Sequence, residues 1–170
     1  YHLKGETIRE DYDKVGDEAI FSLTSQNLFA QFTPQSSASP AWELSLNPRP
    51  DLALRADLGV GEFSFDLSDM NLDEVVIDFA VGSTTVTLPK SGNYTLDVDG
   101  AIGQIIIEVP RGAAVRIDPD TALVGSDFPA SYREEGDAYV SSGYDEAEFY
   151  AEITVDLAIG SVEVRELGSD

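Results

Sequence analysis

The chain has 170 residues, a length that fits one domain with at most a modest appendage. Its 32 acidic and 10 basic residues give a formal net charge of −22, which would repel nucleic acids and anionic membrane surfaces, so neither is expected as a partner. The absence of cysteine excludes disulfides, thiol nucleophiles and cysteine-ligated metal centres. Such acidity suits cationic peptides, divalent ions or a high-salt habitat, although solubility alone would also explain it.

The first 41 residues lack a regular pattern, and we interpret them as an N-terminal lead-in with a possible first strand. Residues 1–16 show no sustained apolar period and indicate a lead-in or a loosely attached strand. The next apolar residues mix two spacings, and we favour a strand over 19–23, whereas the Pro- and Ser-rich stretch 33–40 predicts a loop. Because the chain begins at Tyr1 rather than Met, we expect a processed form or fragment whose missing N-terminus could hold an anchor or signal.

Residues 42–170 show the alternation of a β-repeat domain. Trp42, Leu44 and Leu46 alternate with polar residues, which predicts a half-buried strand, and similar alternation recurs to the C-terminus. Each later strand is interrupted by an aliphatic residue followed by glycine, at Gly61, Gly82, Gly103 and Gly160, with a degraded copy at Gly125. The intervals are 21, 21, 22 and 35 residues, and Gly143 could mark a degenerate repeat inside the longest one.

This pattern predicts an all-β fold, a single-stranded, β-solenoid-like stack of strand-Gly-strand repeats. We interpret Gly61, Gly82, Gly103 and Gly160 as structural hinges at equivalent positions, because glycine within a strand marks a bend or a close backbone approach. Alternation around the hinges predicts a set of inward side chains, namely Leu58, Phe63, Phe65, Val86, Leu88, Ile105, Ile107, Val162 and Val164.

The segment WELSLNPRPDLALRADLGVGEFSFDLS, followed by VGSTTVTLP and IGQIIIEVPRGAAVRI, resembles the bacterial LiaF-like cell-wall-active antibiotics response C-terminal domain and the toastrack putative-adhesin family. The resemblance covers roughly residues 42–165. It implies a right-handed, single-layer stack of β-rungs in the bacterial cell envelope, membrane-tethered in the full-length protein, and in one branch a regulator of an envelope-stress signalling system. The strong acidity and the insertion before Gly160 depart from the family pattern.

The sequence contains few of the residues that enzymes use for catalysis. His2 is the only histidine, so neither a triad base nor a multi-histidine metal site is expected. A Ser–Lys nucleophile would have to draw on Lys4, Lys14 or Lys90. The carboxylate pairs are better explained as turn caps and solvated faces than as glycosidase acids, and these pairs are Asp66/Asp69, Asp73/Glu74 and Glu134/Glu135. We therefore predict no enzyme, no catalytic residue and no cofactor.

Two glycine- or acid-rich motifs resemble binding loops only in part. The DVDG segment at Asp97 and Asp99 lacks the remaining ligands of a calcium loop, so outward strand residues are expected instead, and no metal site is predicted. The LGVG segment ending at Gly61 lacks the third glycine and the helix of a dinucleotide site. The sequon at Asn93 would matter only in a glycosylating secretory pathway.

The predicted function is a non-catalytic sensing, regulatory or protein-interaction module. A protein or cationic peptide is the expected partner, membrane contact is expected only through a segment missing from this chain, and the sequence leaves self-association open. The alternatives are a structural or adhesive surface module and a carbohydrate-active protein. A cleft lined by acids and aromatics near residues 132–150 would favour the carbohydrate alternative, whereas flat, covered strands would favour interaction.

Overall fold

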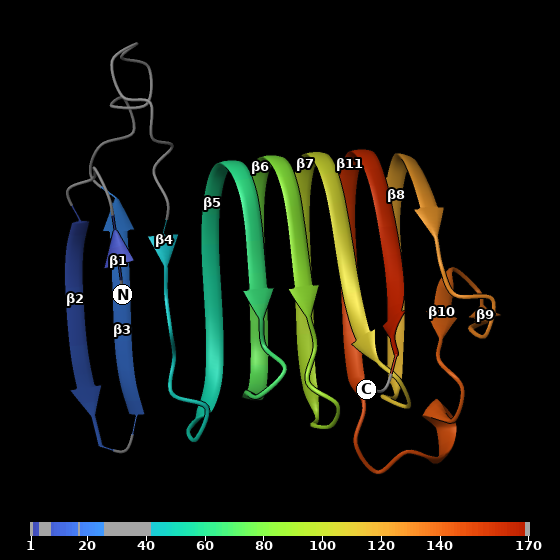
Figure 1. Ribbon diagram of the computed structural model, residues 1–170, viewed down its shortest axis with the longest axis horizontal. Coiled ribbons are helices and arrows are strands. Elements are labelled where there is room, and N and C mark those ends of the chain that lie inside the picture. The colour runs from blue at the N-terminus through green and yellow to red at the C-terminus, as the bar shows by residue number, and fades with distance from the viewer. Residues whose placement is uncertain (1, 4–7, 17, 26–41, 169–170) are drawn as a thin grey trace. The chain divides into compact units, whose positions relative to one another are not determined.

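The computed structural model describes residues 2–3, 8–16, 18–25 and 42–168, and these are nearly all β-strand (Figure 1). The chain divides into two compact units, residues 1–46 and 47–170, whereas the sequence placed a boundary after residue 41. The loop predicted over 33–40 lies outside the described residues. Within the described ranges, no helix has the length and apolar character needed to cross a membrane.

The described residues of the first unit form two small antiparallel sheets. Strand β2 (Ile8–Val15) pairs with β3 (Glu18–Ser25), which confirms the strand predicted over 19–23. Strand β1 (His2–Leu3) pairs with β4 (Trp42–Glu43) over two positions. The prediction of a half-buried strand from Trp42 to Leu46 is wrong. Strand β4 ends at Glu43, and the side chains of Trp42, Leu44 and Leu46 are exposed by 39 to 49%. Alternation alone does not bury a side chain without a second layer to cover it.

The second unit is a stack of five long strands, completed by two short strands and one turn of 3₁₀-helix, η2. The long strands are β5 (Asp51–Asp66), β6 (Asn71–Thr87), β7 (Tyr94–Pro110), β8 (Val115–Asp127) and β11 (Ala151–Leu167). The short elements are β9 (Arg133–Glu135), β10 (Ala138–Val140) and η2 (Tyr144–Glu146). The spatial order is β5-β6-β7-β11-β8-β10-β9, with every long strand parallel to its long neighbours.

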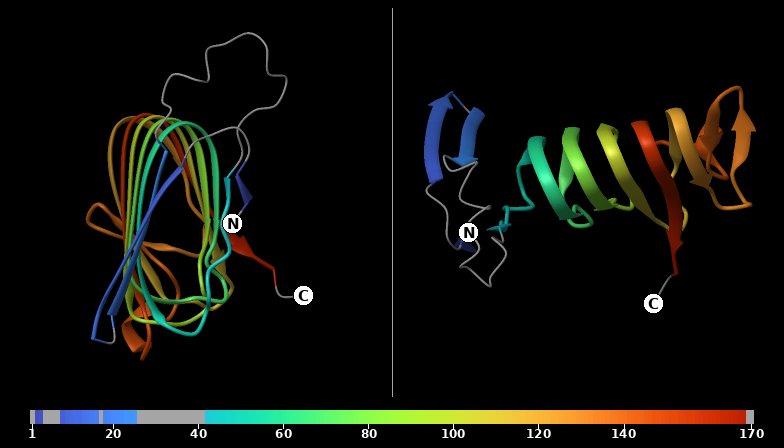
Figure 2. Two further views of the ribbon diagram at one scale, coloured as in Figure 1. Left: turned by 90° about the vertical axis from the view of Figure 1, so that its left-hand side faces the viewer. Right: turned by 90° about the horizontal axis from the view of Figure 1, so that it is seen from above.

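Each long strand contributes to both walls of the stack. In β6 the buried positions run through Val75, Ile77 and Phe79, then resume at Thr84 and Val86, so their parity changes. The two residues after Phe79 are both exposed, which marks the crossing between the walls. Figure 1 shows the long strands crossing at one common edge, and the left view of Figure 2 shows their two halves as opposite walls. The buried side chains meet between these walls.

The predicted core is confirmed in the centre of the stack and only half-buried at one end. The buried members are Val86, Leu88, Ile105, Ile107, Val162 and Val164. Leu58, Phe63 and Phe65 of β5 pack against the core but remain partly exposed. The reason is position, because β5 is the terminal strand of this sheet and pairs with β6 on one side only.

The order of the last repeats differs from the sequence-based expectation. The repeat of Gly160 lies between β7 and β8, so the last long strand in sequence is the fourth in space. Gly125 is opposite Ser161, one position away from the glycine row, where Val124 stands opposite Gly160. Gly143 is no repeat either, because it adopts a left-handed conformation and precedes η2.

Candidate interaction surface

The four hinge-candidate glycines lie in one register row. Gly61 is opposite Gly82, Gly82 opposite Gly103, and Gly103 opposite Gly160. A Cβ on any of the last three would collide with the backbone carbonyl of the preceding glycine, and all three have positive φ values, between 145° and 151°. A side chain is therefore excluded at these three positions for steric and conformational reasons.

The other sequence candidates that the structure describes lie on separate elements. His2 lies on β1 opposite Glu43, Lys14 on β2 opposite Ala19, and Lys90 in the exposed turn after β6, while Lys4 lies outside the described residues. Asn93 is also used structurally, because its Oδ1 accepts a 3.0 Å hydrogen bond from the backbone N–H of Tyr150. Across the part of the chain that is described, no three His, Asp or Glu side chains converge as a metal site.

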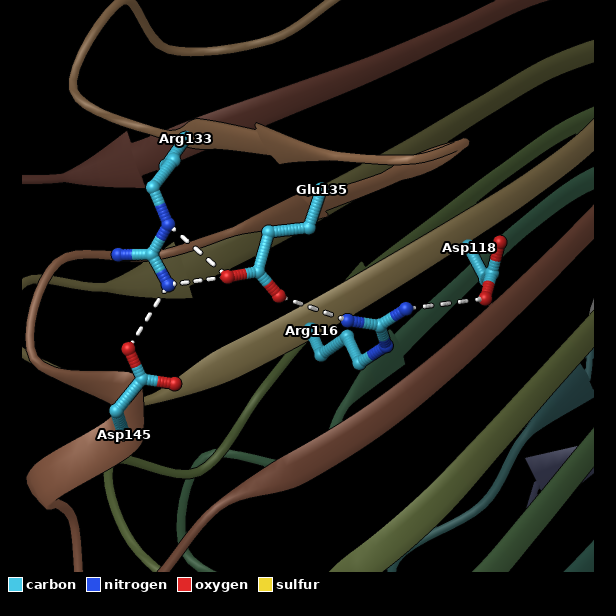
Figure 3. Close-up of polar contacts among 5 residues, drawn as sticks. All are labelled: Arg116, Asp118, Arg133, Glu135 and Asp145. Atoms are coloured by element: carbon cyan, nitrogen blue, oxygen red, sulfur yellow. Dashed lines mark hydrogen bonds and ion pairs between the residues drawn. The ribbon is translucent and has the colours of Figure 1, made fainter.

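Two of the carboxylate pairs are occupied by local contacts. Asp66 accepts hydrogen bonds from the hydroxyl and backbone N–H of Ser68, at 2.6 and 3.2 Å, and these bonds lower the pKa of Asp66. Glu135 joins an ion-pair cluster (Figure 3), with Arg133 2.6 Å and Arg116 3.3 Å from its two oxygens. The same Arg133 reaches Asp145 of η2 at 2.8 Å. The cluster thus connects β9 to β8 and η2 at the end of the stack.

A row of five aspartates crosses the outer face of the long strands. Each member lies opposite the next in register, and in spatial order they are Asp57, Asp78, Asp99, Asp156 and Asp120. Neighbouring strands lie about 4.8 Å apart, so the row concentrates negative charge along roughly 19 Å. We call these residues the aspartate row.

The aspartate row is neutralised mainly at one end. The guanidinium of Arg55 lies 3.1 Å from Asp57 and 2.8 Å from Asp78. Asp99, in the middle, has its pKa raised by partial burial first and then by the charges of Asp78 and Asp156. The central carboxylates therefore gain from a proton or from an added cationic partner.

A second register row runs beside the first at the crossing of the strands. Its members are aliphatic and exposed, by 71% at Val60, 39% at Val81, 47% at Ile102 and 49% at Ile159. On β8, Leu123 lies in register with Ile159. We call the four exposed residues Val60, Val81, Ile102 and Ile159 the aliphatic row.

An open depression of about 560 Å³ is lined by the long strand β8 and by the β9–β10 hairpin. Its lining includes four carboxylates and one aromatic side chain, namely Asp118, Asp120, Glu134, Asp137 and Tyr139. The ring of Tyr139 stacks at 3.8 Å on Phe128, so one of its faces is already covered. The depression overlaps the predicted cleft near residues 132–150 only over residues 134–139, and its lining is rich in acids and poor in aromatics.

The two rows have a repeated motif in the sequence that alignment on the glycines does not reveal. Every long strand carries an aspartate, a variable residue, a small residue and an aliphatic residue in that order, as DLGV, DFAV, DGAI, DTAL and DLAI. Alignment on the glycines alone missed this unit and also misplaced β8, since DTAL is followed by Val124 and only then by Gly125. Alignment on the aspartates gives the observed register.

The comparisons with known proteins agree with the fold. The family model described as "N-terminal domain of toast_rack, DUF2154" matches residues 1–108, and that described as "Cell wall-active antibiotics response LiaF, C-terminal" matches residues 56–164. No curated protein matches the chain. A crystal structure of a putative cell adhesion protein from Clostridium sporogenes is similar, with a TM-score of 0.84 and 20% identity over 94% of this chain and 76% of that one. That identity shows a shared fold, and the two family matches, each over more than half of the sequence, show that the chain belongs to the LiaF-like and toastrack family.

Proposed function

We propose that this domain is a non-catalytic interaction module of the bacterial cell envelope that senses or binds a cationic protein segment. Its family includes the C-terminal domain of LiaF, whose description names a response to cell wall-active antibiotics, and this supports an envelope location. In the full-length protein, a segment outside this chain would tether it to the membrane. The right-handed winding of a β-solenoid belongs to the same proposal.

The aspartate row is the observation that supports this function. Carboxylates spaced at the strand separation create a continuous negative potential, and Arg55 contacts only its first two members. The parallel, paired strands hold this array rigid, so a cationic partner would meet charges already in place and would order few side chains on this face. The formal net charge of −22 adds long-range attraction to the same partner.

Binding of an unstructured polycation tests this function. We expect an oligolysine peptide to bind with an affinity that falls steeply as salt rises, because exposed charges are screened beyond about 8 Å at physiological ionic strength. The double variant Asp99→Asn/Asp156→Asn should weaken binding. The variant Asp69→Asn/Asp73→Asn removes the same charge from exposed positions outside the row and serves as the matched control. Equal losses in the two variants would show attraction to net charge alone, without a site.

Each of two alternative functions is supported by one observation. The structural neighbour described as a putative cell adhesion protein favours an adhesive surface module. The acid-lined depression beside Tyr139 favours a carbohydrate-active protein. Salt-insensitive binding of a neutral oligosaccharide that is lost in Tyr139→Ala would establish the carbohydrate function in place of the proposed one.

A further inference from the structure

The aliphatic row places exposed apolar side chains next to one another on the surface of the stack. Single exposed aliphatic side chains are common on soluble proteins, whereas contiguous apolar patches mark sites of interaction. Here the same register position is aliphatic on all five long strands, and the exposed fractions at Val60, Val81, Ile102 and Ile159 range from 39 to 71%. The repeated exposure of aliphatic side chains at one register position therefore indicates a contact surface.

The surroundings of the aliphatic row define a shape and a charge. Small residues separate it from the aspartate row and are themselves exposed, namely Gly59, Ala80, Ala101 and Ala158. On its other side lies the row of glycines. The aliphatic side chains are therefore flanked on both sides by residues with little or no side chain. The aspartates follow three positions away, about 10 Å along an extended strand.

The spacing of the two rows matches an α-helix better than an extended peptide. Neighbouring members of a row are about 4.8 Å apart. A helix presents a side chain on one face at each turn, about every 5.4 Å, and its diameter of about 10 Å suits the separation of the rows. An extended peptide presents side chains on one face only every 6.6 to 6.8 Å, and so loses register after two strands.

We propose that the aliphatic row and the aspartate row together dock a cationic amphipathic helix of a partner protein. The helix lies across the strands, with an apolar stripe on the aliphatic row and one Lys or Arg per turn on the side of the aspartate row. A length of about 13 residues spans the five strands, given a rise of about 1.5 Å per residue. This inference rests on the proposed binding of cationic segments and adds the structure of the ligand.

Charge excludes the other occupants of an apolar surface. A second copy of this chain would bring its own net charge of −22 against the aspartate row. An anionic lipid surface would be repelled for the same reason. A helix with basic residues beside its apolar stripe satisfies both rows at once.

The test uses two synthetic peptides of equal composition. In one, Leu residues form a single helical stripe flanked by Lys; in the other, the same residues are scrambled so that no stripe forms. We expect the amphipathic peptide to bind this chain at least about tenfold more tightly, as measured by fluorescence anisotropy. The variant Ile102→Thr/Ile159→Thr, which keeps β-branched side chains on the strands, should abolish that advantage and leave the affinity for the scrambled peptide unchanged.

The control variant and the unfavourable outcomes separate the two proposals. Ile20→Thr/Phe21→Thr changes two exposed apolar residues outside the aliphatic row and should preserve the preference for the amphipathic peptide. Equal affinity for both peptides, with sensitivity to Asp99→Asn/Asp156→Asn, would overturn the docking of a helix and leave the proposed function standing. Binding of neither peptide would overturn both.

Discussion

Gly160 lies in register beside Gly103, and the backbone carbonyl of Gly103 occupies the space that a Cβ on residue 160 would need. The same relationship joins Gly103 to Gly82 and Gly82 to Gly61. The strand beside β7 must therefore bring a residue without a side chain to this position. Strand β11 supplies Gly160, whereas β8 carries Val124 at the equivalent position and lies one strand further out. The observed strand order therefore keeps the four glycines in consecutive positions of the row, with β8 outside them.

Gly103→Ala should destabilise the domain by more than about 4 kcal/mol, because the new Cβ would collide with the carbonyl of Gly82 and because the φ of 151° is strained for any L side chain. Gly59→Ala is the matched control on β5. A Cβ there meets nothing within 4 Å, and alanine should stabilise the strand by about 0.5 to 1 kcal/mol. Chemical unfolding measures both. Similar stabilities of the two variants would remove the steric explanation of the glycine row.

The repeating part of the fold could be predicted from the sequence, whereas the ends of the stack and the order of its strands could not. Alternation around Gly82 and Gly103 predicts the inward residues of β6 and β7 correctly, because paired neighbours and an opposite wall cover those strands. At Trp42 the same alternation predicted a half-buried strand that continues to Leu46, whereas β4 ends at Glu43 and the apolar side chains are exposed. Side-chain periodicity says nothing about the presence of a covering layer. The strand order depended on a contact between backbones 57 residues apart, which a linear repeat count cannot detect.

The position of the acidic surface could not be predicted from the sequence. Net charge alone led to the expectation of a cationic partner, which stays a prediction. The alignment of Asp57, Asp78 and Asp99 required the register, and the position of Asp156 between Asp99 and Asp120 required the strand order. Those aspartates are distributed over 100 positions of sequence, so composition could not reveal that they form one line.

Phe65→Ala should lower the free energy of unfolding less than Ile107→Ala does, although phenylalanine is the larger side chain. The two residues lie in one inward register row, in which Val86 separates them. Ile107 is fully buried, so its truncation should cost about 2 to 5 kcal/mol, whereas Phe65 is half-buried on the terminal strand and should cost less than the about 3 kcal/mol typical of a buried phenylalanine. Thermal or chemical unfolding decides the order. A larger loss at Phe65 would mean that the β5 end of the core is covered in solution.

Thr84→Val should stabilise the domain by about 1 kcal/mol. The hydroxyl of Thr84 is fully buried and has no hydrogen-bond partner, and valine replaces it with a methyl group of similar shape. Thr85→Val is the control, because its side chain is half-buried on the outer side of the same strand and should change the free energy of unfolding little. A loss of stability in Thr84→Val would imply a hidden partner for the hydroxyl, such as a buried water.

Asp99→Asn should raise the stability of the domain at neutral pH and leave it unchanged in acid. Burial and the charges of Asp78 and Asp156 raise the pKa of Asp99 in the folded state, so between its unfolded and folded values the folded protein binds a proton that the unfolded chain does not. Stability therefore falls as the pH rises through that window, and the cost of the charged side chain is fully present above it. Asparagine removes that cost.

Asp66→Asn provides the control of opposite sign. The hydrogen bonds from Ser68 lower the pKa of Asp66, so its contribution to stability is present above the unfolded pKa and is lost as the pH falls through the folded pKa. Thermal unfolding at pH 7 should thus rank Asp99→Asn above the wild type and Asp66→Asn below it. At a pH below all of these pKa values, both carboxyl groups are protonated in either state and the differences should disappear. A gain in Asp99→Asn that persists unchanged in acid would come from packing, and the charge of the aspartate row would not be its cause.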